Sequence, residues 1–122
     1  MSEPKQIIVM RTDLNMRRGK MIAQGAHASM KVLLDYQHIP EEDWAARRHW
    51  LSESFTKICV RADSEEDLLE IHAKAMLAGL HTAVIVDAGR TEFHGVPTTT
   101  CIAIGPEYPE DLVGITDELK LL

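Results

Sequence analysis

The sequence predicts an α/β protein, because short apolar runs typical of buried strands alternate with longer helical patterns. Such alternation implies crossover connections and a mostly parallel sheet that helices cover on both faces. The connection over residues 93–97 is too short to hold a helix, so we expect the last strand to run antiparallel. The length of 122 residues is that of one domain, spanning residues 1–122.

Four runs of residues predict the strands. Residues 6–10, 82–86 and 99–104 are nearly continuous apolar runs, as in strands buried on both faces. Residues 56–61 alternate polar and apolar side chains, which suits a strand nearer an edge. Cys59 and Cys101 each lie in such a run, so we expect buried, reduced thiols. Two cysteines also exclude a disulfide scaffold and a zinc site built on cysteine.

Helical patterns separate the strands. Residues 17–37 form the longest candidate helix, and Pro40 opens a shorter one with acidic residues in its first turn. Ser64 begins a sequence close to a capping box, and Gly79 stands where that helix should end. Residues 109–113 predict a last short turn or helix.

The net charge of −6 argues against indiscriminate binding to nucleic acid, but the charge is unevenly distributed. Residues 1–60 carry a net charge of +2 and residues 61–122 a net charge of −8. The longest run without a charged residue, residues 93–106, is too short to span a membrane. We therefore expect a cytoplasmic protein. A local basic cluster is either a solvated helix start or a binding surface, and it comprises Arg11, Arg17, Arg18, Lys20 and Lys31.

Helical periodicity places polar residues along one side of the first helix: Lys20, Gln24, His27 and Lys31. The opposite side is expected to face the core, and it carries Ile22, Ala26, Ser29 and Leu33. The residues around the polar stripe are small or apolar, unlike those of a typical hydrated surface. A hydrated face and a functional or interface role therefore both remain open.

Asp87 directly follows the apolar run over residues 82–86, at the strand end where ligands bind in open α/β sheets. A partly desolvated carboxylate there could act as a base or orient a cation. The alternative is a turn, with Asp87 as its first residue and Gly89 supplying the bend. Three hydroxyls at residues 98–100 could hold a water or an ester carbonyl, although threonine is also common in strands.

Several spaced motifs occur in order, and the wider pattern to which they belong covers nearly the whole chain except about residues 37–55. They are Arg11-Thr-Asp13-Leu-x-Met16-x-x-Gly19-Lys20-x-x-Ala23-Gln24-x-Ala26-His27-Ala28, Asp87-Ala-Gly-Arg-Thr91, Thr100-x-x-x-Ile104-Gly105-Pro106 and Ile115-Thr116-x-x-Leu119-Lys-Leu121. Together these motifs resemble those of the type 2 peptidyl-tRNA hydrolase family.

The resemblance implies a three-layer α/β/α sandwich on a four-stranded mixed sheet, usually in a homodimer. It implies hydrolysis of the ester that joins a peptide to tRNA, without a metal or other cofactor. By motif, Lys20, Asp87 and Thr100 match the catalytic positions. The residues expected to bind substrate are Arg17, Arg18, Gln24, His27, Arg90 and Thr98.

Physical roles can be assigned to these residues as hypotheses. Asp87 would orient or deprotonate the attacking water, and Lys20 would balance developing negative charge. Thr100 would position the water or the ester; Thr98 or Thr99 could replace it, because the preceding loop is one residue longer than is common in the family.

The three arginines expected at the substrate, Arg17, Arg18 and Arg90, would hold phosphates of the tRNA acceptor end. His27 would either join the site or pack against a partner subunit. Three alternatives remain beside the hydrolase: an RNA-binding module without productive catalysis, a hydrolase for another ester or amide, and a structural dimerisation domain.

Overall fold

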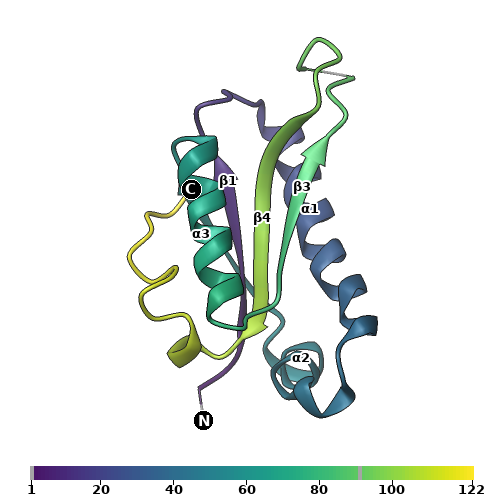
Figure 1. Ribbon diagram of the computed structural model, residues 1–122, viewed down its shortest axis with the longest axis vertical. Helices are drawn as coiled ribbons and strands as arrows, with labels where there is room; N and C mark the ends of the chain where they lie inside the picture. Colours follow the sequence, from purple (N-terminus) through teal and green to yellow (C-terminus); the bar gives the residue numbers. More distant parts are fainter. Residues whose placement is uncertain (1, 91) are drawn as a thin grey trace.

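A computed structural model describes residues 2–90 and 92–122 and contains a four-stranded mixed sheet (Figure 1). Its strands are β1 (Lys5–Arg11), β2 (Thr56–Ala62), β3 (Thr82–Asp87) and β4 (Thr98–Glu107), in the order β2-β1-β4-β3. β2 lies at an edge, as its alternating sequence predicts.

The antiparallel direction of the last strand, β4, is confirmed, and the other three strands point the same way. Because β4 lies between β1 and β3, however, β1 and β2 are the one parallel pair among neighbouring strands. The expectation of a mostly parallel sheet therefore holds for strand directions but not for the hydrogen-bonded pairs.

The two main helices cover opposite faces of the sheet, which confirms the α/β/α arrangement (Figure 1). α1 (Arg18–Leu34) continues into a 3₁₀ turn, η1 (Asp35–His38), so the predicted extent of this helix is confirmed. α3 (Glu65–Leu77) is capped by Ser64, whose hydroxyl accepts the Asp67 backbone N–H at 3.0 Å. Gly79 follows this helix with a φ of 77°, the left-handed conformation that the sequence predicts there.

The segment between α1 and β2 differs from the expected single helix. It contains a 3₁₀ turn, η2 (Glu41–Asp43), then α2 (Ala45–His49), then a π-helical turn, η3 (Trp50–Ser54). Trp50 is fully buried and donates its Nε1–H to the Thr56 carbonyl at 2.7 Å, which ties this turn to the start of β2. The last predicted element is a single 3₁₀ turn, η4 (Pro109–Asp111).

Side chains from the two faces of the sheet form two apolar layers. The layer under α3 contains Ile7, Val9, Leu68, Ile102 and Ile104, and the layer under α1 contains Ile8, Met10, Ala28, Val32 and Ala103. α1 packs mainly on β4 and β3 and leaves part of the β1–β2 surface uncovered. The prediction of two buried cysteines is therefore half wrong: Cys101 is buried, but Cys59 on β2 is exposed.

A carboxyl group is buried at the end of β4. Glu107 is 9% exposed, and its Oε2 accepts the His81 backbone N–H at 2.9 Å. Burial raises the pKa of Glu107 from an ordinary 4.5 to about 7, although this hydrogen bond opposes the rise. The folded protein therefore binds a proton at Glu107 more tightly than the unfolded chain does.

Glu107→Gln should remove a pH-dependent part of the stability. In the parent protein this part is complete below about pH 4.5 and is lost as the pH rises to about 7. As the pH rises from about 4.5 to about 7, the free energy of unfolding of the variant should therefore increase relative to that of the parent, by on the order of 2–3 kcal/mol. Urea unfolding at pH 5 and pH 8 measures this difference. A gap that is the same at both pH values would contradict it.

Candidate active site

An ion pair lies where β3 ends beside the first turn of α1. Asp87 is the last residue of β3, and its Oδ2 is 3.1 Å from Lys20 Nζ. The Lys20 side chain is 12% exposed and that of Asp87 16% exposed, so both charges are largely shielded yet reachable from solvent. The structure thus brings together the two residues on which the predicted chemistry most depends.

The Asp87 carboxylate accepts further hydrogen bonds at both oxygens. The Gly89 backbone N–H donates to Oδ2 at 2.9 Å, and Gln24 Nε2 donates to Oδ1 at 3.1 Å. Gly89 has a φ of 81°, and a Cβ there would come within 2.2 Å of the Val96 carbonyl oxygen. The two interpretations of Asp87 are therefore compatible, because one carboxylate both starts a turn and stands at a ligand-binding edge.

These contacts keep Asp87 ionised. Burial alone would raise its pKa, but the Gly89 N–H, the Lys20 ammonium and the Gln24 amide together lower the pKa below its ordinary value. A carboxylate of low pKa is a weak base at neutral pH. The arrangement therefore suits the orientation of a water molecule or a cation better than complete removal of a proton.

Gln24 and Thr100 lie beneath the ion pair and are almost completely buried. The Thr100 hydroxyl donates to Gln24 Oε1 at 2.6 Å, which leaves the Gln24 NH₂ group to donate to Asp87. The predicted contact between Thr100 and the reacting water or ester stays a prediction. In this structure Thr100 reaches Asp87 through Gln24.

A β-bulge directs Thr100 toward α1. Ile85 pairs with Cys101 but Val86 pairs with Thr99, so Thr100 is an extra residue in β4 at this point. Thr100 and Cys101 consequently both contact α1, and the Cys101 thiol donates to the Gln24 carbonyl at 3.3 Å.

Two residues of the β3–β4 loop also contact the start of α1, and sequence reasoning missed both. Lys20 Nζ lies 5.5 Å from the centre of the Phe93 ring, and Glu92 Oε1 lies 2.9 Å from Arg17 Nε. Two signals were available in the sequence. Phe93 is an aromatic residue in a short loop, and Glu92 is an acidic residue directly after the Asp87 motif. Thr91, the last residue of the Asp87 motif, lies outside the described residues.

The remaining predicted substrate residues do not join this cluster. His27 and Arg90 are exposed, and the Thr98 hydroxyl donates to the Val96 carbonyl at 2.8 Å. Arg18 lines a groove beside α1, next to Met21 and Ile22. Of the site residues predicted from sequence, Lys20, Gln24, Asp87 and Thr100 come together.

The predicted orientation of α1 is only partly correct: Ser29 and Leu33, expected to face the core, are half-buried. Ile22 and Ala26, expected to face the core, are exposed, and Ile22 is 72% exposed. The buried side of the helix instead carries Gln24, Gly25, Ala28 and Val32. The expected polar stripe is split, because Gln24 turns inward while His27 and Lys31 stay exposed. A buried polar side chain with hydrogen-bond partners defeats a prediction based on hydropathy alone.

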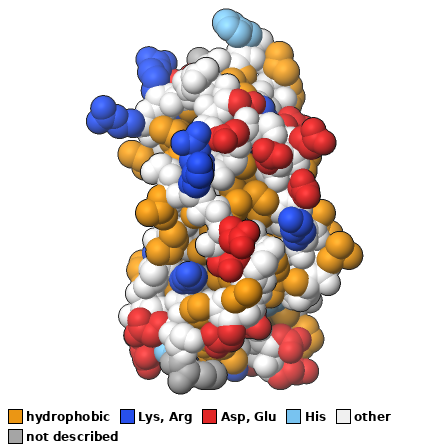
Figure 2. All heavy atoms as spheres, turned by 90° about the vertical axis from the view of Figure 1, so that its left-hand side faces the viewer, with side chains coloured by type: hydrophobic (Ala, Val, Ile, Leu, Met, Phe, Trp, Pro, Cys, Tyr) orange, Lys and Arg blue, Asp and Glu red, His pale blue; other side chains and the backbone are white. Residues whose placement is uncertain are grey.

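The acidic half of the chain covers a different face. Exposed acidic residues lie on α3 and on the segment after β4; they include Glu65, Glu66, Asp67, Glu70, Asp117 and Glu118. Figure 2 shows acidic side chains spread across the side of the molecule that these segments form in Figure 1. The basic residues at the start of α1 are thus separated from much of the negative charge.

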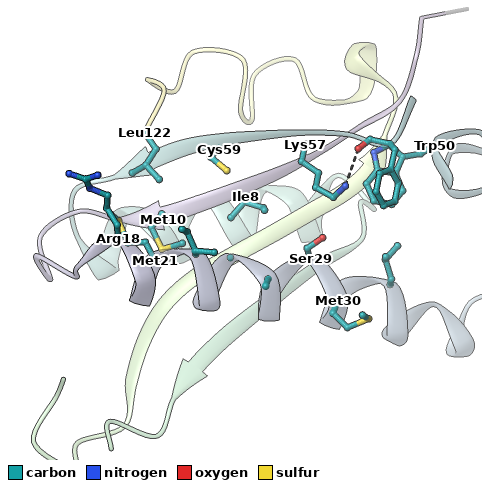
Figure 3. A pocket seen from close by; sticks show the side chains of 15 residues that line it. Ile8, Met10, Arg18, Met21, Ser29, Met30, Trp50, Lys57, Cys59 and Leu122 are labelled. Carbon is teal, nitrogen blue, oxygen red and sulfur yellow. Dashed lines mark hydrogen bonds between the residues drawn. The ribbon is translucent and has the colours of Figure 1, made fainter. Parts of the chain in front are cut away.

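An apolar groove of about 600 Å³ runs between α1 and the uncovered part of β1 and β2. Its lining includes Ile8, Met10, Ile22, Met30, Trp50 and Cys59. Figure 3 shows Arg18 and Leu122 at one end of this groove and Trp50 and Lys57 at the other. The groove lies along the side of α1 that was predicted to face the core.

Among the described residues, no group of three or more His, Cys, Asp or Glu side chains could hold a metal ion. None of the described helices is long and apolar enough to cross a membrane.

The fold and the cluster define an α/β/α protein with a shielded lysine–aspartate pair at the carboxyl end of a strand. Over residues 4–122 the sequence matches the family described as "Peptidyl-tRNA hydrolase PTH2", and the chain belongs to this family. It is 42% identical to a peptidyl-tRNA hydrolase of Methanocaldococcus jannaschii, over 97% of this chain and 99% of that protein.

Two further relatives carry the same name. A peptidyl-tRNA hydrolase of Metallosphaera sedula is 45% identical over 97% of this chain and 99% of its own length. One of Halobacterium salinarum is 44% identical, over 96% of this chain and 98% of its own length. The similarity therefore extends over nearly the full length of each protein.

Lys20→Met should raise the pKa of Asp87, because the lysine lowers that pKa both by its charge and by a hydrogen bond. NMR titration of the Asp87 carboxyl carbon measures the shift. Lys31→Met is the matched control, because Lys31 lies on the same helix but donates to the Val84 carbonyl at 3.0 Å. An unchanged Asp87 pKa in folded Lys20→Met protein would mean that the ion pair does not form in solution.

Proposed function

We propose that this protein hydrolyses peptidyl-tRNA to free peptide and tRNA, in the cytoplasm and without a metal or other cofactor. The observation that carries the proposal is the shielded Lys20–Asp87 pair, whose two residues come from separate family motifs. Family membership and the names of full-length relatives support the choice of substrate. Two free cysteines fit a reducing compartment.

In the proposed reaction, Asp87 orients a water molecule for attack on the ester carbonyl carbon. The carbonyl oxygen gains negative charge as the new C–O bond forms, and Lys20 stabilises that charge. The bond from the carbonyl carbon to the ribose oxygen then breaks. This oxygen takes one proton of the attacking water, and the other proton leaves to solvent as the peptide carboxyl group ionises. The products are a peptide carboxylate and a tRNA with a free hydroxyl. Gln24 and Thr100 act by holding Asp87 in place.

The tRNA acceptor end would bind beside the start of α1. Arg17, Arg18 and Arg90 are exposed and can contact phosphates, which fixes position without reading sequence. Arg17 pairs with Glu92, so a phosphate would have to compete with that carboxylate. Thr98 pairs with Asp87 in the sheet, and His27 follows Gln24 by three residues on α1. Both remain candidates for contact with the substrate.

Purified protein should release the acyl group from N-acetylated aminoacyl-tRNA, with or without a chelator, and spare free aminoacyl-tRNA. Asp87→Asn should lower the rate by about 100-fold or more, because the water loses its orienting carboxylate. Asp35→Asn, an exposed carboxylate at the far end of α1, should leave the rate unchanged.

Absence of cleavage by folded protein would contradict the proposal. If tRNA binding then weakened with salt, an RNA-binding module would be favoured, because phosphate contacts release counterions. Turnover of small esters without competition by tRNA would instead favour a hydrolase of another substrate.

We further propose that the protein is a homodimer in which α1 of each copy covers the apolar groove of the other. Ile22 is 72% exposed and Met30 58% exposed, and both line the groove. A continuous apolar surface of this kind is typical of an interface, because monomeric proteins rarely leave one in water. The family resemblance supports the same assembly.

Ile22→Lys combined with Met30→Lys should convert the dimer to monomer, because the added charges would be buried at the interface. Sedimentation equilibrium measures the mass. Leu77→Lys is the control, because Leu77 is 90% exposed on α3 at the other face of the sheet. A parent protein that sediments as a monomer at all concentrations would refute the dimer.

A further inference from the structure

A side chain from β1 donates to a main-chain carbonyl beside the bulge in β4. Arg11 is the last residue of β1, and its Nη1 donates to the Thr99 carbonyl at 2.8 Å. Thr99 directly precedes Thr100, the extra residue of the bulge. Arg11 is therefore bonded to the backbone next to the residue that holds Gln24.

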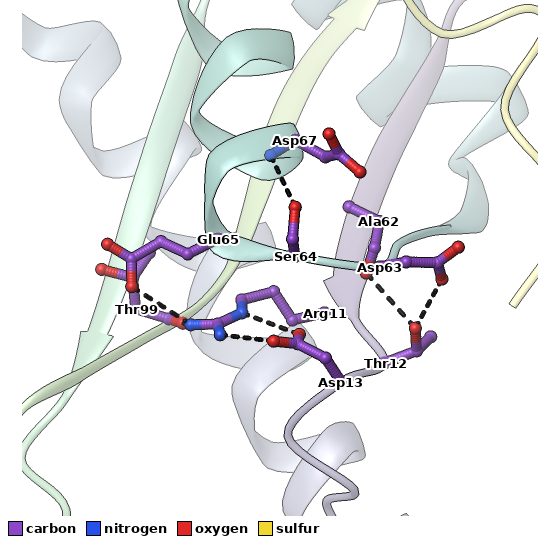
Figure 4. Close-up of polar contacts among 9 residues, drawn as sticks. All are labelled: Arg11, Thr12, Asp13, Ala62, Asp63, Ser64, Glu65, Asp67 and Thr99. Carbon is purple, nitrogen blue, oxygen red and sulfur yellow. Dashed lines mark hydrogen bonds and ion pairs between the residues drawn. The ribbon is translucent and has the colours of Figure 1, made fainter.

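The Arg11 guanidinium is itself fixed from two sides (Figure 4). Its Nε and Nη2 donate to the two oxygens of Asp13, at 3.0 and 2.7 Å, and Nη1 lies 3.3 Å from Glu65 Oε2 at the start of α3. The Arg11 side chain is only 9% exposed, and its hydrogen bond lowers the pKa of Asp13. A planar, charged group with a two-bond contact to a carboxylate is rigidly placed.

We propose that Arg11 is a positioning residue for the hydrolysis: it holds the β4 bulge, which aims Thr100 at Gln24 and so fixes the Asp87 carboxylate. The inference rests on the proposed function for its kinetic consequence. Its structural consequence, the state of Asp87, can be measured without any substrate.

The direction of each hydrogen bond supports this chain of contacts. Thr100 donates to Gln24 Oε1, so the Gln24 amide must present its NH₂ group to Asp87. If the bulge shifted, Gln24 could rotate its amide and turn Oε1 toward the carboxylate, where two acceptors would repel each other. Loss of the Gln24 hydrogen bond would also weaken one of the contacts that lower the pKa of Asp87.

The neighbouring strand supplies a matched control. Arg61 and Asp63 have the same spacing at the end of β2, with Arg61 Nε and Nη2 at 3.1 and 2.9 Å from Asp63 Oδ1. These side chains are 43% and 66% exposed, and the described side-chain hydrogen bonds of Arg61 go to Asp63 alone. Arg61→Met removes a similar arginine–aspartate pair without touching the bulge.

The experiment compares Arg11→Met, Arg11→Lys and Arg61→Met by kcat and KM on N-acetylated aminoacyl-tRNA, by NMR titration of Asp87, and by thermal unfolding. Arg11→Met should lower kcat by about 10-fold or more, because a small displacement of reacting groups is costly. KM should change by less than about twofold, because Arg11 does not touch the substrate. The pKa of Asp87 should rise. Arg11→Lys can keep one N–H on Thr99 and should restore part of both effects.

Wild-type kcat and Asp87 pKa in a folded Arg11→Met variant would overturn the inference. So would an equal loss of kcat in Arg61→Met, because a general loss of stability would then explain both results. If Arg11→Met does not fold, Arg11→Lys decides: an unchanged Asp87 pKa and an unchanged kcat would count against Arg11. An inactive parent protein would refute the proposed function, and the Asp87 titration would still test the positioning role.

Discussion

The buried amide of Gln24 is the constraint on which the rest of this structure depends. A polar side chain enclosed between a helix and a sheet must have its hydrogen bonds satisfied. Otherwise the free-energy cost of removing it from water exceeds the stabilisation gained by packing. Thr100 satisfies the amide oxygen and Asp87 the amide nitrogen. Only one rotation of α1 about its axis allows both contacts. That rotation puts Lys20, one turn earlier on the same side, against Asp87.

The same rotation accounts for the apolar groove. With Gln24 turned inward, the apolar side of α1 points away from β4, toward the uncovered part of β1 and β2. Ile22 and Met30 are thereby left exposed. The polar site and the apolar surface are thus two results of one packing choice, and they lie on opposite sides of a single helix.

Much of the fold could be predicted from local sequence, because it depends on local chemistry. Continuous apolar runs located the strands, and Ser64 and Gly79 marked the ends of α3. The rotation of α1 could not be predicted, since hydropathy places a glutamine outside unless its partners are known. Those partners, Thr100 and Asp87, are more than sixty residues away in the chain.

Those residues of the site that stand in sequence motifs could be predicted, but the contacts between them could not. Lys20 and Asp87 could be named from sequence, whereas the bulge at Thr100 depends on the register of two strands, which composition does not encode. Arg11 stood inside a motif, and only Asp13 lies near it in sequence. Its contacts with Glu65 and Thr99 exist only in the folded chain.

The place of β4 in the sheet has a consequence for biosynthesis. β4 is the last of the four strands to be translated, yet it lies between β1 and β3. Before β4 emerges from the ribosome, β3 has no neighbouring strand, α1 lacks most of the surface on which it packs, and Gln24 has no Thr100 to bond. Such non-local pairings form late and cooperatively. A nascent chain therefore acquires its lysine–aspartate site in one step, once β4 has been made, rather than gradually as the earlier strands appear.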